Sequence, residues 1–282
     1  MTPASPRAPT PGEAAETAAI KDALVRFYAG TRATLEKDFL DPAVPLGSEV
    51  FFRETEATRY RLYPYLPSLV GFERWAGKRV LEVGTGMGVD HVRFARAGAT
   101  LTGVDLTPSH LQITAARLKR EGLASRLLQG DAERLPCGDA SFDHVYSCGV
   151  LFLVPDIQRA VDEVYRILKP GGEALVMLYH RTSFHHYLKT LAFMGLVWGD
   201  LLYLTRQKLV DWSADGYDYP IIRLYSRRQA RRIFGRFAEV RMAVRTLTPA
   251  EFPVIGQRLP TDFLEFAARR FGFFLFIRAV KG

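Results

Sequence analysis

The hydrophobic pattern divides the chain into two parts near residue 71. Over residues 15–70, apolar and aromatic side chains recur at helical spacing, as at Ile20 and Leu24. A turn-rich stretch at 41–47, with the sequence DPAVPLG, separates the helical pieces. The pattern therefore predicts an N-terminal helical lid over 15–70, beside a core domain at 71–282.

From residue 78 onward, short apolar runs alternate with amphipathic stretches. The runs predict five buried strands, at 78–83, 99–105, 125–131, 141–147 and 173–179. The stretches between them predict helices at 88–97, 108–120 and 157–168. Strands that alternate with helices through short loops form a parallel sheet with helices on both faces, so the fold class is α/β.

The last third of the chain breaks this rhythm. Residues 225–237 predict a helix, and 237–247 and 271–281 predict two strands with no helix between them. Such strands form an antiparallel hairpin that closes the sheet. Residues 181–225 are irregular and rich in aromatic residues, which predicts an insertion covering the substrate at the carboxyl edge of the sheet. Ordinary burial of these residues is the alternative. The aromatic residues are Phe184, Tyr187, Phe193, Trp198, Tyr203, Trp212, Tyr217 and Tyr219.

Composition adds limits on location and partners. Residues 1–14 are rich in Pro, Ala and Thr and have no apolar signal core, which predicts a disordered leader. The longest apolar run, 191–204, is interrupted by Gly199 and Asp200 and is too short to span a bilayer. The two cysteines form no disulfide framework, so a reducing cytoplasm is the expected location.

Three glycines in five residues, Gly84, Gly86 and Gly88, follow the first strand in the sequence VLEVGTGMG. A strand that enters a helix through a glycine turn exposes backbone N–H groups to a nucleotide-like ligand. Asp105 ends the second strand about twenty residues later, where a carboxylate accepts hydrogen bonds from ribose hydroxyls. Asp131 ends the third strand, where it either meets the amine of adenine or belongs to an ordinary Gly-Asp turn.

The segments VLEVGTGMG, LTGVD, GDAERLP, FDHVYSCGVLFLVPD and LKPGGEALVM together resemble the class I S-adenosylmethionine-dependent methyltransferases. The resemblance is closest to the small-molecule branch, which includes the methyltransferase type 11 and UbiE-like proteins. It implies a Rossmann-like, seven-stranded, mostly parallel sheet with an antiparallel last strand. The implied cofactor is S-adenosyl-L-methionine, and the product is S-adenosyl-L-homocysteine.

The resemblance also implies roles for individual residues. Glu82 and Gly84 would lie near the methionine amino group, Asp105 would hold the ribose, and Leu106 would flank the adenine. Arg59 or Tyr60 would meet the methionine carboxylate, or would only pack their helix on the sheet. The full set of expected cofactor-binding residues is Glu82, Gly84, Thr85, Gly86, Gly88, Asp105, Leu106, Asp131, Ala132, Ser147, Cys148, Gly149, Arg59 and Tyr60.

Methyl transfer is an in-line displacement, and it needs a base only when the acceptor carries a proton at neutral pH. The candidate catalytic residues are Tyr179 and His180, which end the fifth strand. His180 is the first choice because its ordinary pKa suits proton transfer, and capping of the strand end is the alternative. The expected substrate-binding residues are Tyr28, Phe152, His185 and Tyr187. The histidines lack the further ligands that a metal would need, so no metal site is expected.

The sequence thus predicts an enzyme that methylates a small aromatic or apolar acceptor. Five arginines between 227 and 236, and a net charge of +8, leave RNA or a membrane lipid or quinone as alternative acceptors. A solvated helix face is the favoured explanation of those arginines, so a nucleic-acid partner is not expected. Peripheral membrane contact stays open, the oligomeric state is not predicted, and the other alternative is a protein that binds the cofactor without transferring methyl groups.

Overall fold

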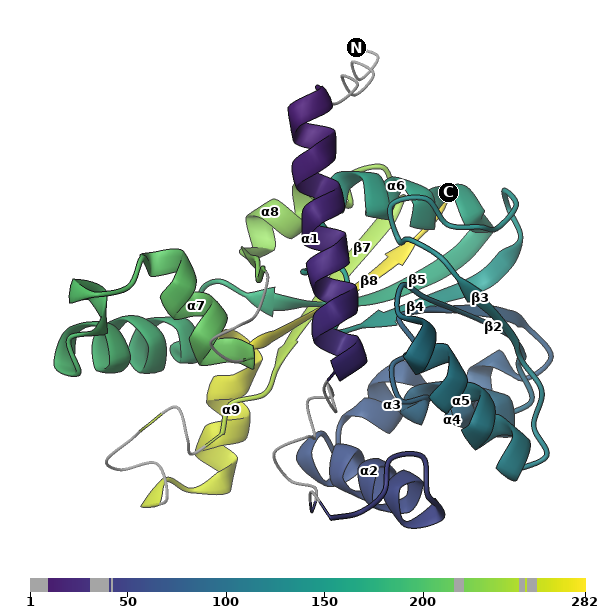
Figure 1. Ribbon diagram of the computed structural model, residues 1–282, viewed down its shortest axis with the longest axis horizontal. Coiled ribbons are helices and arrows are strands. Elements are labelled where there is room, and N and C mark those ends of the chain that lie inside the picture. The colour runs from purple at the N-terminus through teal and green to yellow at the C-terminus, as the bar shows by residue number, and fades with distance from the viewer. Residues whose placement is uncertain (1–9, 31–40, 42, 216–220, 249–251, 253–257) are drawn as a thin grey trace.

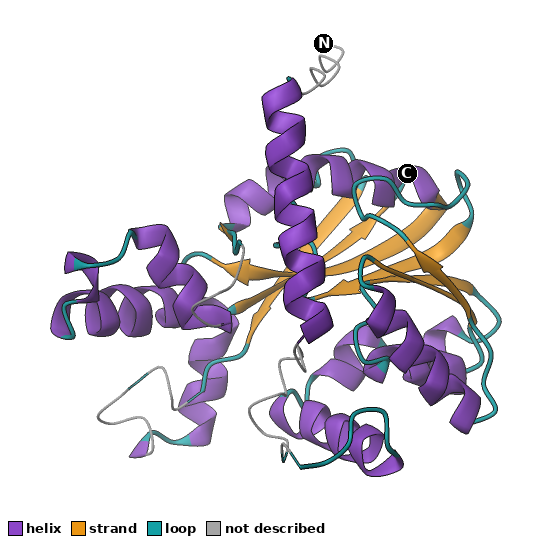
Figure 2. Cartoon of the chain, viewed as in Figure 1, coloured by secondary structure: helices purple, strands orange, loops and turns teal. Residues whose placement is uncertain are grey.

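The computed structural model describes residues 10–30, 41, 43–215, 221–248, 252 and 258–282. One sheet organises the described part of the chain, in the order β3-β2-β1-β4-β5-β8-β7 (Figures 1 and 2). Its strands are β1 (Arg79–Val83), β2 (Thr100–Asp105), β3 (Arg126–Gln129), β4 (Phe142–Cys148), β5 (Leu168–His180), β7 (Glu239–Arg245) and β8 (Phe274–Val280). A two-residue strand, β6 (Leu224–Tyr225), pairs with the end of β5 outside this order.

The strand directions confirm the predicted Rossmann-like plan. β1 to β5 run parallel, while β8 runs antiparallel between β5 and β7. The central strands are buried on both faces, as Val80, Val145 and Leu175 are. Continuous apolar runs of this kind are typical of parallel strands that helices cover on both sides.

Helices cover both faces of the sheet. α4 (Val89–Arg96) and α5 (Pro108–Arg120) lie on one face, and α6 (Ile157–Ile167) and α8 (Arg227–Ile233) lie on the other (Figure 1). α2 (Glu49–Leu62), α3 (Leu66–Val70) and a 3-10 turn at Phe72–Trp75 precede β1. None of the helices in the described ranges combines the length and the apolar character needed to cross a membrane.

The first helix, α1 (Pro11–Gly30), starts earlier than the composition predicted. Residues 1–9 of the expected disordered leader lie outside the described residues, but residues 11–14 are already helical. Thr10 and Glu13 explain this start. The Thr10 amide donates to Glu13 Oε2 at 2.6 Å, and the Glu13 amide donates to Thr10 Oγ1 at 3.3 Å. Such a reciprocal capping box satisfies donors that the first turn leaves open.

The prediction that no helix separates the last two strands is wrong. α9 (Thr261–Phe271) lies between β7 and β8, although the strands pair as the expected antiparallel partners. α9 buries the small Ala267 and Ala268 with Leu264, while Phe263 and Phe266 are exposed. Because large apolar residues lie on the outer side as well, the helical period is hidden in the sequence.

The expected insertion at 181–225 is also helical. It contains a π-helix, η3 (His185–Val197), a 3-10 turn, η4 (Asp200–Leu202), and α7 (Arg206–Asp215). η3 and α7 lie side by side and extend away from the sheet, at the left of Figure 1.

Candidate active site

A cavity lies at the carboxyl ends of the parallel strands, beneath α1. The glycine turn after β1, the ends of β2, β4 and β5, and the side chains of α1 line it. Most of the residues expected to bind the cofactor share this cavity. They are Arg59, Glu82, Gly84, Thr85, Gly86, Asp105, Leu106, Asp131, Ala132, Cys148 and Gly149.

The glycine turn is shaped by close approach on one side and by open space on the other. Gly84 has φ +83°, and a Cβ there would lie 2.1 Å from Val150 Cγ2. Gly86 has φ +51°, lines the cavity, and has no atom within 4 Å of a Cβ position. The backbone at Gly86 is therefore open to a ligand.

Gly88 does not line the cavity, contrary to the prediction that it binds the cofactor. It has φ +71° and is the N-cap of α4, and a Cβ there would lie 3.0 Å from Thr114 Oγ1. Packing between α4 and α5 explains this glycine.

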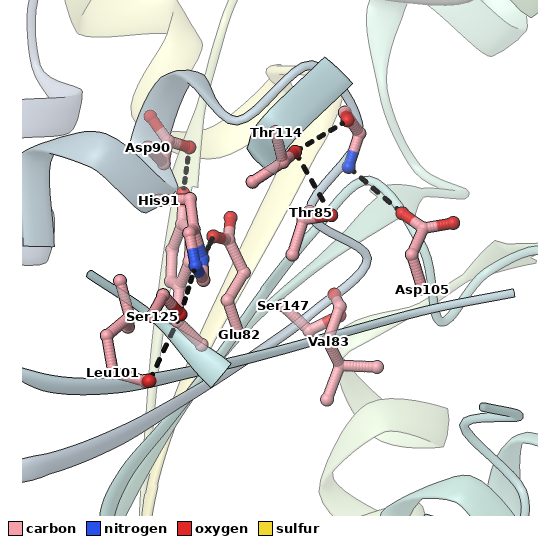
Figure 3. A network of polar contacts seen from close by, with 12 residues as sticks. Glu82, Val83, Thr85, Asp90, His91, Leu101, Asp105, Thr114, Ser125 and Ser147 are labelled. Atoms are coloured by element: carbon pink, nitrogen blue, oxygen red, sulfur yellow. Dashed lines mark hydrogen bonds and ion pairs between the residues drawn. The ribbon is translucent and has the colours of Figure 1, made fainter. Parts of the chain in front are cut away.

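Asp105 is held in place by backbone amides, one of which is drawn in Figure 3. Its Oδ2 accepts from the Gly86 amide at 3.0 Å, and its Oδ1 accepts from the Thr107 amide at 2.8 Å. His110 Nδ1 lies 3.3 Å from Oδ2, while His110 Nε2 is buried without a hydrogen-bond partner. The carboxylate thus joins the glycine turn to the start of α5, in a fixed position at the cavity wall.

Glu82 ends in a buried hydrogen-bonded chain, also drawn in Figure 3. Its Oε2 lies 2.7 Å from His91 Nδ1, and His91 Nε2 lies 2.8 Å from Ser125 Oγ. Because the Ser125 hydroxyl donates to the Leu101 carbonyl, its oxygen accepts the proton of His91 Nε2. A neutral His91 then offers Nδ1 as an acceptor, to which a protonated Glu82 donates.

Burial explains why this pair is uncharged. It raises the pKa of Glu82 well above its usual value, and the nearby charge of Asp90 adds to the effect. Burial also lowers the pKa of His91 to about 3. Burial thus favours the protonated form of Glu82 beside the glycine turn, and a cation bound near it would favour the carboxylate.

Arg59 and Asp90 form a buried ion pair at the cavity. Arg59 Nε donates to Asp90 Oδ1 at 2.9 Å, and its Nη2 donates to Oδ2 at 2.5 Å. The hydroxyls of Tyr60 and Tyr146 also donate to Asp90. Burial opposes ionisation of Asp90, but Arg59 and the two hydroxyls outweigh it and lower the Asp90 pKa.

Two side chains near this ion pair, Tyr60 and Cys148, do not act on a ligand in the cavity in the way their types allow. Tyr60 does not line the cavity, contrary to its expected role at the methionine carboxylate, because its hydroxyl serves Asp90. Cys148 Sγ lies 3.6 Å from Arg59 Nη2, yet burial raises its pKa to about 11. Cys148 is therefore a neutral thiol at pH 7 rather than a nucleophile.

α1 covers the ends of β2 and β3. Lys21 Nζ donates to Asp131 Oδ2 at 2.5 Å and to Glu133 Oε2 at 2.6 Å. The ring of Tyr28 meets the ring of His110 edge to face, with centroids 5.4 Å apart. Tyr28 thus lines the cavity, but beside Asp105 and His110 rather than at a separate acceptor pocket.

The opposite end of the cavity is apolar. Phe152, Leu153 and Val154 line it from the loop after β4, and Tyr179 lines it from β5. Phe152 and Tyr179 stack with centroids 3.8 Å apart and an interplanar angle of 21°. Tyr179 also packs on Phe273, with centroids 4.3 Å apart.

His180 does not face the cavity, so the first choice for a base is wrong. Successive side chains of a strand point to opposite faces, and Tyr179 takes the cavity side. His180 Nδ1 lies 3.1 Å from the Gly272 carbonyl, and its Nε2 lies 2.8 Å from Thr182 Oγ1. The alternative, a histidine that fastens the end of the strand, matches these contacts.

Three further predicted residues lie outside the cavity. Ser147 is fully buried and donates to the Val83 carbonyl at 3.1 Å, because it sits on a central strand between two sheet neighbours. His185 stacks on Phe273, with centroids 4.2 Å apart. Tyr187 is exposed on η3.

The aromatic insertion does not roof the cavity within the described residues. No described residue of 181–225 lines it, and Tyr217 and Tyr219 lie outside the described part of the chain. The insertion instead contacts the backbone of the loop that follows β4, whose side chains line the cavity. The Arg223 amide donates to the Phe152 carbonyl at 3.1 Å, and Arg223 Nη1 donates to the Pro155 carbonyl at 2.6 Å.

Several lining residues were missed by the sequence analysis. Lys21 and Leu24 share a helix face with Tyr28, at a spacing of three and four residues, which signals a common contact. Asp90 and His110 follow the glycine turn and Asp105 by a few residues and are polar positions near helix starts. The described residues contain no cluster of His, Cys, Asp and Glu that could hold a metal ion.

Comparison with known proteins now identifies the domain. Residues 81–176 match the family model described as a methyltransferase domain. Residues 81–176 therefore contain a methyltransferase domain. This agrees with the expected family resemblance, and S-adenosylmethionine as the cofactor stays a prediction.

Curated relatives of the methyltransferase domain match over a limited length. A demethylmenaquinone methyltransferase of Tropheryma whipplei is 42% identical over 102 residues, which cover 36% of this chain and 41% of the relative. A sterol 4-C-methyltransferase of Caenorhabditis elegans is 29% identical over 150 residues, covering 50% and 44%. An uncharacterized protein of Mycobacterium tuberculosis is 43% identical over 97 residues, covering 34% and 35%. The chain thus spans less than half the length of these relatives.

Solved structures agree with the fold of the methyltransferase domain. A methyltransferase of Thermotoga maritima, described as a possible histamine N-methyltransferase, has a TM-score of 0.51 at 24% identity, covering 84% of this chain and all of its own. An S-adenosylmethionine-dependent methyltransferase of Mesorhizobium loti has a TM-score of 0.53 at 22% identity, covering 77% and 97%. At these identities the likeness concerns the fold.

Proposed function

We propose that the protein transfers the methyl group of S-adenosylmethionine to a small apolar acceptor. One observation carries the proposal: a single cavity joins a polar end, built on Asp105 and the glycine turn, to an apolar end built on Phe152 and Tyr179. Ligand sites of this kind are mostly apolar, with a few placed polar groups. Relatives of the domain that are named for quinone and sterol substrates support an apolar acceptor.

The polar end fits the cofactor group by group. Asp105 would accept from the ribose hydroxyls, and the open backbone at Gly86 leaves room for close approach. The unpartnered His110 Nε2 offers one more hydrogen bond on the same side. Glu82 and Arg59 would meet the ammonium and carboxylate of the methionine part. Asp131 already accepts from Lys21, so an adenine amine would share this carboxylate with α1.

When bound, the cofactor would supply a methyl group on a positively charged sulfur, and the sulfur would leave with the electrons of the C–S bond as an electron pair of the acceptor bonds to the methyl carbon. The chain contributes orientation and the exclusion of water. α1 closes the polar end, and the stacked Phe152 and Tyr179 hold the acceptor at the apolar end.

Tyr179 is the remaining candidate for a polar contact to the acceptor. Of the two predicted catalytic residues, it alone lines the cavity. We propose that its hydroxyl hydrogen-bonds the reacting group. Tyr179→Phe should then lower kcat about tenfold, the value of one hydrogen bond, with cofactor affinity unchanged. An unchanged kcat would assign Tyr179 to the wall only.

The function is tested with methyl-labelled S-adenosylmethionine and a panel of acceptors. The panel contains short-chain quinols, sterols, small phenols, histamine and total RNA. We expect label in an apolar acceptor, and Phe152→Ala should raise its KM at least tenfold while leaving the Kd for S-adenosylhomocysteine within twofold. Label only in RNA, or binding of the cofactor with transfer to no acceptor in a broad metabolite extract, would contradict the proposal.

The RNA alternative has less support in the structure. Arg236 pairs with Asp162 at 3.0 Å and lies over the ring of Tyr165, and Arg227 donates to the Arg269 carbonyl. Two of the five arginines are therefore engaged within the fold rather than presented to a phosphate backbone.

A further inference from the structure

The end of η3 and the turn that follows it carry an exposed apolar surface, which we call the apolar tip (residues 196–203). Five of its side chains are more than 60% exposed: Leu196 (73%), Val197 (69%), Trp198 (62%), Leu202 (81%) and Tyr203 (86%). Single exposed apolar residues are ordinary on protein surfaces, but a contiguous group at one turn marks an interaction site.

The apolar tip is not an unpacked fragment of the core. η3 and α7 bury their own apolar residues, including Met194, Leu209 and Val210. At Gly195, a Cβ would lie 2.8 Å from Leu201 Cδ1 and 3.2 Å from Leu209 Cδ2. The two helices are thus packed closely against each other, and the five exposed side chains of the tip remain outside that packing.

The position of the tip makes it accessible. η3 and α7 project from the body of the protein, away from the sheet and from α1 (Figures 1 and 2). The tip is remote from the cavity, but the base of η3 is joined to the cavity wall. His185 stacks on Phe273, and Phe273 packs on Tyr179.

The fully exposed charged side chains of the segment that carries the tip are basic. Among the described residues of 181–211, the exposed charged side chains are Arg181, Arg206 and Lys208, and Lys189 is half-buried. The acidic side chains of this stretch are buried or half-buried. Asp211 is 2% exposed and accepts from the Ile222 amide, and Asp200 is half-buried with a buried Oδ2.

We propose that the apolar tip inserts into the surface of an anionic phospholipid bilayer. Trp and Tyr favour the interface between water and hydrocarbon, and apolar side chains beside them add buried area. Basic residues near a membrane surface are attracted by anionic lipids. Charge complementarity thus selects a bilayer over a second copy of this chain, because two tips of like charge repel each other.

The inference concerns binding and does not depend on methyl transfer. It adds a source for the acceptor, since a docked tip would hold the protein at a bilayer, in which apolar acceptors dissolve. A failure of vesicle binding leaves the proposed function intact, and a failure of methyl transfer leaves the vesicle binding to be measured.

The test is sedimentation of the full chain with sucrose-loaded vesicles of phosphatidylcholine, with and without 30% phosphatidylglycerol. We expect binding to the anionic vesicles at about 0.1 M salt that weakens at 0.5 M salt. A variant with Leu196→Ser, Trp198→Ser, Leu202→Ser and Tyr203→Ser should bind at least tenfold more weakly. These side chains are exposed, so the variant should keep its circular dichroism spectrum.

Matched variants separate the two parts of the argument. Phe266→Ser removes an apolar side chain that is 77% exposed on α9, and its vesicle binding should stay within twofold of the wild type. Arg206→Glu with Lys208→Glu should weaken binding to anionic vesicles about tenfold. Equal binding by the wild type and the tip variant would overturn the proposal. The proposal would also be overturned if the wild-type protein bound neither type of vesicle but formed dimers that the tip variant does not form. The tip would then be an interface with a second copy of the chain.

Discussion

α1 and the segment formed by η3 and α7 differ in a way that the sequence does not reveal. Both contain apolar and aromatic residues, and both are predicted as covers for the substrate. α1 lies on the cavity, where Lys21 reaches Asp131 and Glu133. η3 and α7 pack on each other and project outward. Aromatic content therefore does not predict which segment covers the cavity. The ion pairs of Lys21 with Asp131 and Glu133 do identify α1 as the cover.

The largest effect is expected at the cavity itself. Asp105→Asn keeps the shape of the side chain but replaces one acceptor oxygen with a donor, facing the Gly86 and Thr107 amides and the ribose. We expect the affinity for S-adenosylhomocysteine to fall about 100-fold or more, since charge-assisted hydrogen bonds contribute about 1.5–3 kcal/mol each. Calorimetric titration measures it, with the surface variant Asp139→Asn as the control. An affinity within threefold of the wild type would remove Asp105 from the site.

Protonation of a buried histidine of the central sheet should lower the free energy of unfolding at acid pH. His144 is fully buried, and burial lowers its pKa to about 3, so its neutral form stabilises the fold above the ordinary pKa of about 6.5. This contribution is lost as the pH falls from 6.5 towards 3. Between pH 7 and pH 5, the free energy of unfolding of the wild type should fall about 1–2 kcal/mol more than that of His144→Gln. Urea unfolding measures both, and parallel pH profiles would contradict the assignment.

The ion pairs of Lys21 allow a test of whether α1, unlike η3 and α7, covers the bound ligand. Lys21→Ala removes both ion pairs that fasten α1 across the cavity, so S-adenosylhomocysteine should dissociate about tenfold faster. Stopped-flow displacement measures this rate. Lys119→Ala, on the exposed side of α5, is the matched control and should behave as the wild type. If Lys21→Ala also dissociated at the wild-type rate, α1 would not be a cover.

The smallest effect is expected from the apolar tip. The variant with serine at 196, 198, 202 and 203 should bind S-adenosylhomocysteine within twofold of the wild type, because no described residue of that segment lines the cavity. If the affinity for S-adenosylhomocysteine fell more than fivefold, the tip would also cover the cavity, and it would not differ from α1 in this respect.

The fold was largely predictable because its signals are local. The apolar runs and the Gly-rich turn predict β1 to β5 and the position of the cavity. The two apolar runs at 237–247 and 271–281, together with the family resemblance, predict the antiparallel last strand. α9 was missed because exposed Phe263 and Phe266 mask its buried face.

The site was predictable where one residue follows directly from a motif, as with Asp105 and Gly86. Strand alternation, which decides between Tyr179 and His180, required the exact register of β5. Gly88 and Ser147 lie within the right motifs, but their contacts with Thr114 and the Val83 carbonyl come from distant segments. The role of Lys21 depends on partners more than a hundred residues away, which no local pattern encodes.

The most direct test of the account is a crystal structure of the protein with S-adenosylhomocysteine. The account predicts ribose hydroxyls within hydrogen-bond distance of Asp105, the homocysteine part beside Glu82 and Arg59, and α1 across the ligand. The sulfur should point towards Phe152 and Tyr179. A ligand bound elsewhere, or one covered by η3 and α7 with α1 displaced, would contradict it.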